Sequence, residues 1–144
     1  MKGTAIKRFV LDTSIALAWC FEEEKTPYTE SILDQLSRDA KAHVPAIWPL
    51  EVANALLVAE RRKRITVAQA IHFLERLGGF AITVDETRLP RVFEHLFSKA
   101  REWKLTSYDA AYLELALRKD LPLATLDDDL KKAAHDLGVP IVHV

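Results

Sequence analysis

Short apolar segments alternate with longer amphipathic segments along the chain, and this alternation constrains the fold more than any other feature. Segments rich in β-branched, aromatic and other apolar residues predict buried strands. Five are found, at residues 7–12, 43–46, 80–84, 122–125 and 140–143. Strands that alternate with helices predict a parallel sheet covered on both faces, and right-handed crossovers narrow the topology to a doubly wound α/β fold.

The segments between these strands carry helical start and stop signals. Thr13 and Ser14 can cap a helix that begins at Ile15. Pro49 suits the first turn of the next long apolar helix, and Gly78-Gly79 ends another. The further helices are predicted at residues 28–40, 49–63, 67–77, 87–102, 107–119 and 128–137. With 144 residues, no evident linker and no repeat, we expect a single domain over residues 1–144.

Composition excludes several classes of protein. The only cysteine, Cys20, rules out an intramolecular disulfide and a cysteine-based zinc site, and its apolar surroundings predict a buried thiol. No segment has the roughly 18 uninterrupted apolar residues of a membrane span. The N-terminal residues do not resemble a secretory signal. We therefore expect a cytoplasmic protein without membrane contact.

Charge is nearly balanced, with a formal net charge of −1, so composition alone does not indicate nucleic-acid binding. Residues 61–64 nevertheless form a basic run at the end of the predicted 49–63 helix. Such a run is most often a solvated helix end. It lies about 15 Å or more from Glu51, at 1.5 Å per helical residue. Remote contact with RNA or with a second subunit suits it better than catalysis does.

Four acidic residues stand where open α/β sheets bind their ligands. Asp12 ends the first predicted strand, and Asp127 closely follows the strand at 122–125. Glu51 and Asp109 fall in the first turns of apolar helices. All four can converge at the carboxyl edge of a parallel sheet. Carboxylates that meet repel one another and need a cation to share the site, which points to a divalent-metal enzyme.

Each of these acids also has a purely structural explanation. Asp12 suits a capping turn, and Asp109 stands three residues after Thr106 as in a capping box. The Asp127–Asp129 triplet is typical of a solvated first turn. Glu51 is the hardest to explain in this way, because its helix is apolar on most sides. Independent capping does not require all four acids to fall at one edge.

Several neighbouring polar residues are candidates for supporting roles. Asn54 shares a helix face with Glu51, and Tyr112 can pack beside Asp109 or donate to it. Within the triplet we prefer Asp127, which is nearest the strand end, and keep Asp129 in reserve. The further candidates are the hydroxyl groups of Ser14 and Thr125.

Four segments resemble the successive motifs of PIN-domain ribonucleases, and most closely those of VapC-type toxins. They are VLDTS at 10–14, EVANAL at 51–56, SYDAAY at 107–112 and LATLDDDL at 123–130. The resemblance spans nearly the whole chain in order. It implies a three-layer α/β/α sandwich with about five parallel strands, and Mg²⁺- or Mn²⁺-dependent cleavage of RNA.

The resemblance also implies roles and partners. The acidic positions would be Asp12, Glu51, Asp109 and Asp127, supported by Ser14 and Asn54. Such proteins form homodimers and act as toxins of type II toxin–antitoxin pairs, inhibited by a VapB-like antitoxin. Independently of the family, an all-oxygen ligand set without a histidine pair favours Mg²⁺ or Mn²⁺ over zinc. We expect Asp12 and Asp109 to be the principal ligands.

Three other functions compete with this interpretation. A haloacid-dehalogenase-like phosphatase would need a second Asp where Ser14 stands. A receiver domain would need a phosphorylated Asp after a middle strand, for which residues 83–86 offer a weak substitute. The third alternative is a catalytically silent PIN-like module that binds RNA or protein.

Overall fold

A parallel sheet of four strands forms the centre of the computed structural model, which describes residues 6–143. The strands are β1 (Arg8–Leu11), β2 (Lys41–Val44), β3 (Ile82–Val84) and β4 (Leu123–Ala124). They are arranged in the order β3-β2-β1-β4, and every neighbouring pair is parallel. The chain extends the sheet in one direction from β1 to β3 and then returns to place β4 on the other side of β1. The order therefore reverses between β1 and β4, and open α/β sheets bind ligands at such a point.

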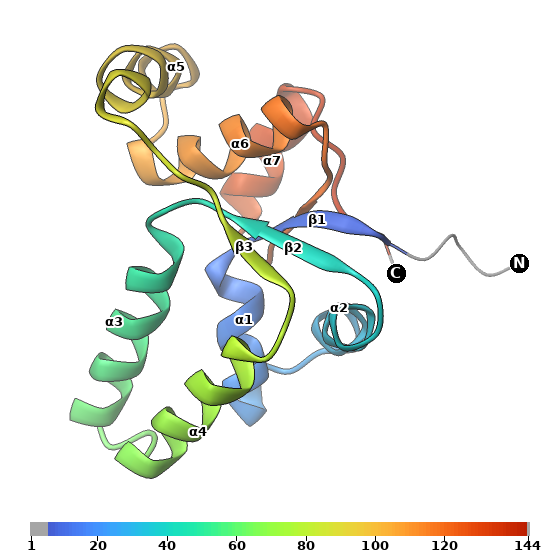
Figure 1. Ribbon diagram of the computed structural model, residues 1–144, viewed down its shortest axis with the longest axis vertical. Coiled ribbons are helices and arrows are strands. Elements are labelled where there is room, and N and C mark those ends of the chain that lie inside the picture. Colours follow the sequence, from blue (N-terminus) through green and yellow to red (C-terminus); the bar gives the residue numbers. More distant parts are fainter. Residues whose placement is uncertain (1–5, 144) are drawn as a thin grey trace, which may run out of the picture.

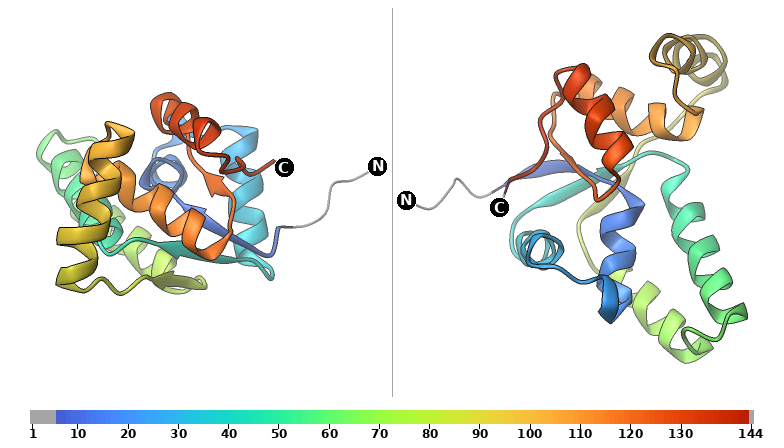
Figure 2. Two further views of the ribbon diagram at one scale, coloured as in Figure 1. Left: turned by 90° about the horizontal axis from the view of Figure 1, so that it is seen from above. Right: turned by 180° about the vertical axis from the view of Figure 1, so that it is seen from behind.

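Helices cover both faces of this sheet (Figure 1). On one side lie α1 (Thr13–Cys20), α2 (Pro27–Ser37), α3 (Trp48–Arg61) and α4 (Val67–Gly78). On the other side lie α6 (Ser107–Lys119) and α7 (Asp128–Asp136), with α5 (Phe97–Trp103) outermost (Figure 2). This arrangement confirms the predicted α/β/α sandwich. No helix that the structure describes is both long and apolar enough to span a membrane.

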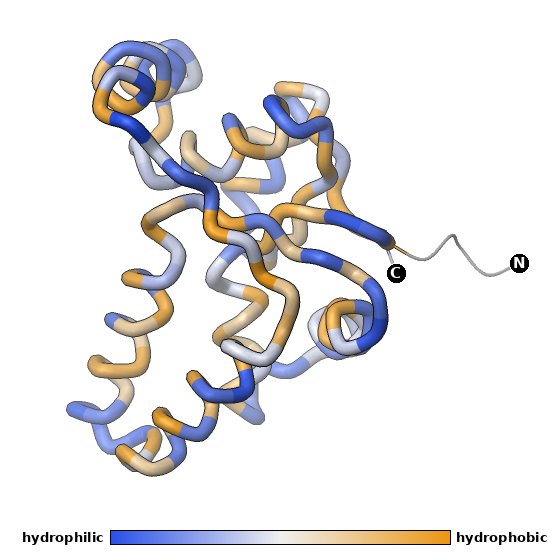
Figure 3. Tube along the Cα trace, in the orientation of Figure 1, coloured by the Kyte–Doolittle hydropathy of each residue, from blue (hydrophilic) through white to orange (hydrophobic). Residues whose placement is uncertain are grey.

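The core is built around β1, because this strand has neighbours on both edges and helices on both faces. Phe9, Val10 and Leu11 are completely buried, as are Leu123 and Ala124 of the adjoining strand. The helices contribute one apolar face each. In Figure 3, hydrophobic and hydrophilic residues alternate along α3 and α4, as amphipathic helices require.

The observed strands differ in their bounds from all five predicted ones, and in two cases proline accounts for the difference. The strand predicted at 43–46 runs instead from Lys41 to Val44, because Pro45 has no N–H to continue the ladder. The strand predicted at 140–143 makes only an isolated parallel bridge, between Ile141 and Leu123. Pro140 again lacks a donor there. The sheet consequently has four strands rather than about five.

The helix predicted at 87–102 is present but not uniform. Residues Arg91–Leu96 form a π-helical segment, η2, which continues directly into α5. Lys104 then ends the helix in the left-handed conformation, with φ of 57°. A short 3-10 helix, η1 (Glu22–Glu24), follows α1.

Figure 1 shows that α3 and α6 both begin on the side toward which the carboxyl ends of the strands point.

Candidate active site

Asp12 stands at the end of the central strand and is almost completely buried, with 9% of its surface exposed. Its Oδ2 accepts hydrogen bonds of 2.7 Å from both Ser14 Oγ and Thr125 Oγ1. Although Asp12 occupies the N-cap position of α1, its side chain makes no capping bond. Capping therefore does not explain this residue. Two hydroxyl groups, one from each side of the β1–β4 junction, orient its carboxylate.

The same hydroxyl groups fasten the loop after β4 to the turn after β1. Ser14 Oγ accepts a hydrogen bond of 3.0 Å from the backbone N–H of Leu126. Thr125 Oγ1 accepts one of 3.0 Å from the backbone N–H of Asp127. Ser14 and Thr125, both singled out in the sequence, thus hold Asp12 and fix the backbone from which Asp127 projects.

Glu51, in the first turn of α3, is held by a tyrosine and a threonine from other elements. Tyr112 of α6 donates to Glu51 Oε1 at 2.6 Å, and Thr13 Oγ1 lies 3.1 Å from the same oxygen. The two hydroxyl oxygens are 2.9 Å apart. Burial, and secondly the bond to Glu51, raise the pKa of Tyr112, so the phenol remains a donor. The hydroxyl of Tyr112, expected to pack beside Asp109 or donate to it, thus donates to Glu51 instead.

Sequence reasoning treated Thr13 only as a cap and missed its contact with Glu51. The one available signal was the buried character expected for Tyr112, since a buried tyrosine hydroxyl usually finds a partner. Asn54, predicted to share a face with Glu51, lies one turn later on the exposed side of α3. It makes no hydrogen bond to Glu51 among the described residues.

Asp109 is half-buried in the first turn of α6, and its carboxylate does not complete a capping box. Thr106 Oγ1 accepts a hydrogen bond of 3.1 Å from the Asp109 backbone N–H, but no reciprocal side-chain bond forms. Burial raises the pKa of Asp109, and the negative charges of nearby acids raise it further. In decreasing order of effect, these acids are Asp127, Asp12, Glu51 and Asp129. The structure therefore brings all four predicted acids into one electrostatic cluster.

Asp127 has two roles. Its Oδ1 caps α7 by accepting from the backbone N–H groups of Asp129 and Leu130, at 2.9 and 3.1 Å. Among the neighbouring charges, that of Asp127 also raises the pKa of Asp109 the most. Asp128 instead points to solvent, with its side chain 96% exposed. Asp127 is therefore the best-placed member of the triplet, and Asp129 has a smaller effect.

The oxygen groups at this edge fit a hard divalent cation. Among residues 6–143, no three His, Cys, Asp or Glu side chains form a ready-made metal cage. Mg²⁺ does not require one, because it keeps several waters and binds one or two carboxylates together with substrate phosphates. The Asp109 carboxylate accepts no hydrogen bond from the described residues and is repelled by its neighbours. A cation would relieve that repulsion.

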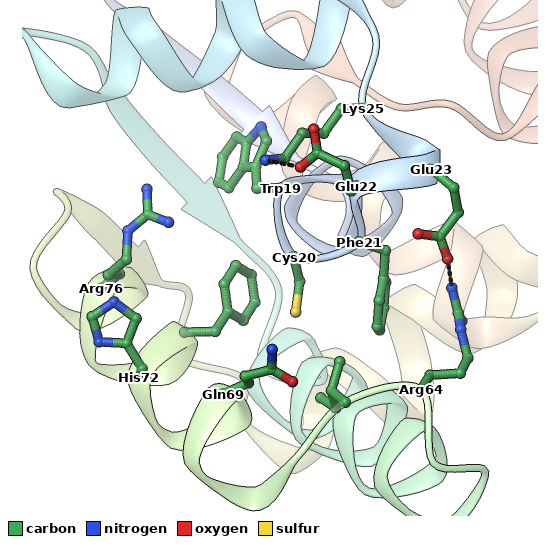
Figure 4. A pocket seen from close by; sticks show the side chains of 12 residues that line it. Trp19, Cys20, Phe21, Glu22, Glu23, Lys25, Arg64, Gln69, His72 and Arg76 are labelled. Carbon is green, nitrogen blue, oxygen red and sulfur yellow. Dashed lines mark hydrogen bonds and ion pairs between the residues drawn. The ribbon is translucent and has the colours of Figure 1, made fainter.

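A hollow of about 400 Å³ lies away from the acidic edge, between the end of α1 and α4 (Figure 4). It is about 12 Å along α1 from Asp12, at 1.5 Å per residue, and none of the four acids lines it. Cys20 is only half-buried at its wall, so the expectation of a fully buried thiol was wrong. Arg64 forms ion pairs here with Glu23 and Glu24, and its guanidinium stacks 4.0 Å above the ring of Phe21.

The basic run at residues 61–64 lies at the end of α3, next to this hollow. All four residues are exposed, and Arg64 among them is bound to the η1 segment through Glu23 and Glu24. None of the four lies at the acidic edge.

The geometry also argues against a receiver domain. Asp85, the acid that follows β3, accepts hydrogen bonds from Arg118 on both carboxylate oxygens. Moreover, β3 is an edge strand in this sheet rather than a middle strand. The residues that a phosphate-accepting site would need are therefore in a structural ion pair.

Comparisons with known proteins agree with this arrangement. The family model described as PIN domain matches residues 9–136. Ribonuclease VapC3 from Pyrobaculum aerophilum is 29% identical over 133 residues, which cover 92% of this chain and 99% of that protein. The match therefore extends over nearly the whole of both chains.

Solved structures show the same fold at lower identity. The PAE2754 protein from Pyrobaculum aerophilum has a TM-score of 0.65 and 24% identity, covering 90% of this chain and 87% of that one. VapBC2 from Rickettsia felis, bound to a DNA fragment from its promoter, has a TM-score of 0.64 and 12% identity, with coverage of 94% and 97%. FitAcB from Neisseria gonorrhoeae has a TM-score of 0.59 and 18% identity, with coverage of 94% and 96%.

We expect Asp109→Asn to increase the thermal stability of the metal-free protein at neutral pH. The pKa of Asp109 is raised above its usual value of 3.8, so the ionised carboxylate opposes folding. This penalty is fully present above the folded-state pKa and is lost as the pH falls through it toward 3.8. Thermal unfolding in chelator should therefore show a gain near neutral pH that shrinks on acidification. The matched control is Asp128→Asn, which changes an exposed charge and should give little effect. A lower melting temperature for Asp109→Asn at neutral pH would contradict the repulsion.

Proposed function

The chain belongs to the PIN-domain family, and from this membership we propose that it is a metal-dependent endoribonuclease, the toxin of a type II toxin–antitoxin pair. The observation that carries the proposal is the convergence of Asp12, Glu51, Asp109 and Asp127 where strand order reverses. Its similarity to ribonuclease VapC3 over nearly all of both chains supports the assignment to RNA. Because its proposed substrate is cellular RNA, we propose that the protein acts in the cytoplasm.

In this proposal, Asp12 and Asp109 bind Mg²⁺ or Mn²⁺, while Glu51 and Asp127 take part directly or through water. When bound, the ion supplies an activated water and neutralises charge on the phosphodiester and on the leaving oxygen. The protein's own contribution is to hold the carboxylates in place. Ser14 and Thr125 orient Asp12, and this leaves its Oδ1 free of the hydrogen bonds that they make to Oδ2.

Glu51 is the acid best placed to move a proton. Its Oε1 accepts a hydrogen bond from Tyr112, which fixes the carboxylate at the start of α3. A carboxylate in this position could accept the proton of the attacking water as the new P–O bond forms and the P–O bond to the leaving oxygen breaks. Tyr112 is therefore a positioning residue in this mechanism, because it acts through Glu51.

We expect Asp12→Asn to lower RNA cleavage by about a hundredfold or more without unfolding the protein, because metal-site chemistry contributes several kcal/mol to such reactions. Wild-type protein freed of any partner should cut RNA with Mg²⁺ or Mn²⁺ and stop when chelator is added. The control is Asp128→Asn, which removes a carboxylate from the same segment but at a solvent-exposed position.

A second readout of the same variants does not depend on turnover. Mg²⁺ should raise the melting temperature of the wild type, because a ligand that binds only the folded state stabilises it. Asp12→Asn should lose most of that shift, and Asp128→Asn should retain it. If Asp12→Asn cuts RNA as fast as the wild type, the site is misassigned. RNA binding without cleavage under either metal would favour the silent PIN-like module.

We propose that a VapB-like antitoxin is the physiological inhibitor. Two of the similar solved structures support this idea by their descriptions, which name VapBC2 and FitAcB. The acidic edge suits a basic segment of such a partner, since a positive side chain there would relieve the same repulsion that a metal ion does.

The antitoxin proposal predicts a short open reading frame next to the gene for this chain. Its product should co-purify with the chain, suppress ribonuclease activity and relieve growth arrest when the two are expressed together. Expression of Asp12→Asn alone should arrest growth little or not at all. An adjacent product that neither binds nor inhibits would contradict the assignment to a toxin–antitoxin pair.

We further propose that the chain is a homodimer. Leu89, Phe93 and Phe97 recur every four residues along η2 and its flanks and therefore lie on one side of the helix. Their exposed fractions are 65%, 67% and 56%. Large apolar side chains grouped on a surface mark an interaction site. A second copy is the occupant that the resemblance to VapC-type proteins favours.

Light scattering after gel filtration should give a dimer mass for the wild type and a monomer mass for Phe93→Glu/Phe97→Glu. The double variant should remain folded by circular dichroism, because both side chains are largely exposed. Leu117→Ala, also at an exposed apolar position but on α6, is the control and should remain dimeric. A wild-type monomer at micromolar concentration would contradict the proposal.

A further inference from the structure

A second hollow, of about 260 Å³, directly adjoins Glu51. It lies between the start of α3 and the start of α6, the two helices that carry Glu51 and Asp109. Its wall consists of Ile47, Leu50, Glu51, Asn54 and Tyr108. The acidic edge and this hollow therefore share one side chain, Glu51, and a molecule bound at the first can extend into the second.

Two large side chains with much apolar surface are exposed to solvent on this wall. Leu50 is 67% exposed and Tyr108 is 58% exposed. Single exposed apolar residues are common and need no explanation. Here, however, the two flank a concave surface, and Tyr108 immediately precedes Asp109 in the first turn of α6. The aromatic ring thus lines the hollow whose wall also includes Glu51 of the acidic cluster.

The chemistry of the wall distinguishes among the parts of a nucleotide. No lysine or arginine lines the hollow, and Glu51 contributes a carboxylate, so a phosphate is disfavoured. An aromatic ring beside aliphatic side chains suits the flat face of a base, and unstacked bases of single-stranded RNA bind in this way. The exposed amide of Asn54 offers both donors and an acceptor for the edge of a base.

We propose that this hollow is a nucleobase subsite, in which a base next to the scissile phosphate stacks on Tyr108 and is contacted at its edge by Asn54. The inference rests on the proposed ribonuclease function and adds to it a source of substrate preference. A base is joined to its phosphate through a single sugar. A phosphate held at the carboxylates therefore brings a neighbouring base to the adjoining hollow.

The test uses a single-stranded oligoribonucleotide that contains a cleavage site mapped with the wild type. Tyr108→Ala should lower kcat/KM on this RNA by roughly five- to a hundredfold, the range expected for losing one base–aromatic stack. Tyr108→Phe keeps the ring and should remain close to the wild type. Asn54→Ala should change the order of preference when the base beside the cut is varied.

A matched substrate separates stacking from a general defect. In the same oligonucleotide with an abasic nucleotide beside the cut, the wild type should fall to the level of Tyr108→Ala. Tyr108→Ala should lose little more, since the interaction is already absent. Leu117→Ala, an exposed residue near the other end of α6, is the control for both substrates and should match the wild type.

Two results would overturn the proposal. One is an equal loss for Tyr108→Ala on intact and abasic RNA, which would give the ring a structural role. The other is a change of oligomeric state in Tyr108→Ala by light scattering, which would show that a second copy covers the hollow. Failure of the ribonuclease function itself would look different, because the wild type would then cut neither RNA.

Discussion

The near-complete burial of Asp12 is the constraint on which this structure depends. A buried charge is tolerated only where hydrogen bonds replace the water that it has lost. Ser14 and Thr125 supply those bonds, and each also accepts from the backbone that follows β4. The need of Asp12 for hydrogen bonds thus helps to fix how β1 and β4 meet, where the two halves of the doubly wound sheet join. The strand that completes the sheet, β4, is only two residues long, so these side-chain bonds supplement a short ladder.

The acidic residues differ in how well their surroundings satisfy them. Hydroxyl groups support Asp12 and Glu51, and backbone N–H groups support Asp127. Asp109 receives no such support from the described residues and carries the repulsion of the others. Proteins tolerate such locally unfavourable groups where function selects for them, and the stability of the remaining core offsets the cost. The completely buried residues 9–11 of β1, at the centre of the sheet, provide that stability here.

Much of this arrangement was predictable, because it depends on local sequence. A residue that follows a buried parallel strand directly or within a few positions lies near the carboxyl edge of the sheet, which is why Asp12 and Asp127 could be placed there. The partners of Glu51 could not be assigned, since Thr13 and Tyr112 are 38 and 61 residues away and meet it only through the packing of α1, α3 and α6. The strand ends at Pro45 and Pro140 were overlooked although the reason, a missing N–H donor, is local.

The double role of Asp127 has an evolutionary consequence. One of its oxygens caps α7, so a residue that cannot accept hydrogen bonds there would weaken the helix as well as the acidic cluster. Asparagine is an equally good cap but carries no charge. A single Asp127→Asn exchange would therefore remove an acid while preserving α7. If the proposed ribonuclease function holds, this exchange is a short mutational path from an enzyme to an inactive scaffold that is still folded.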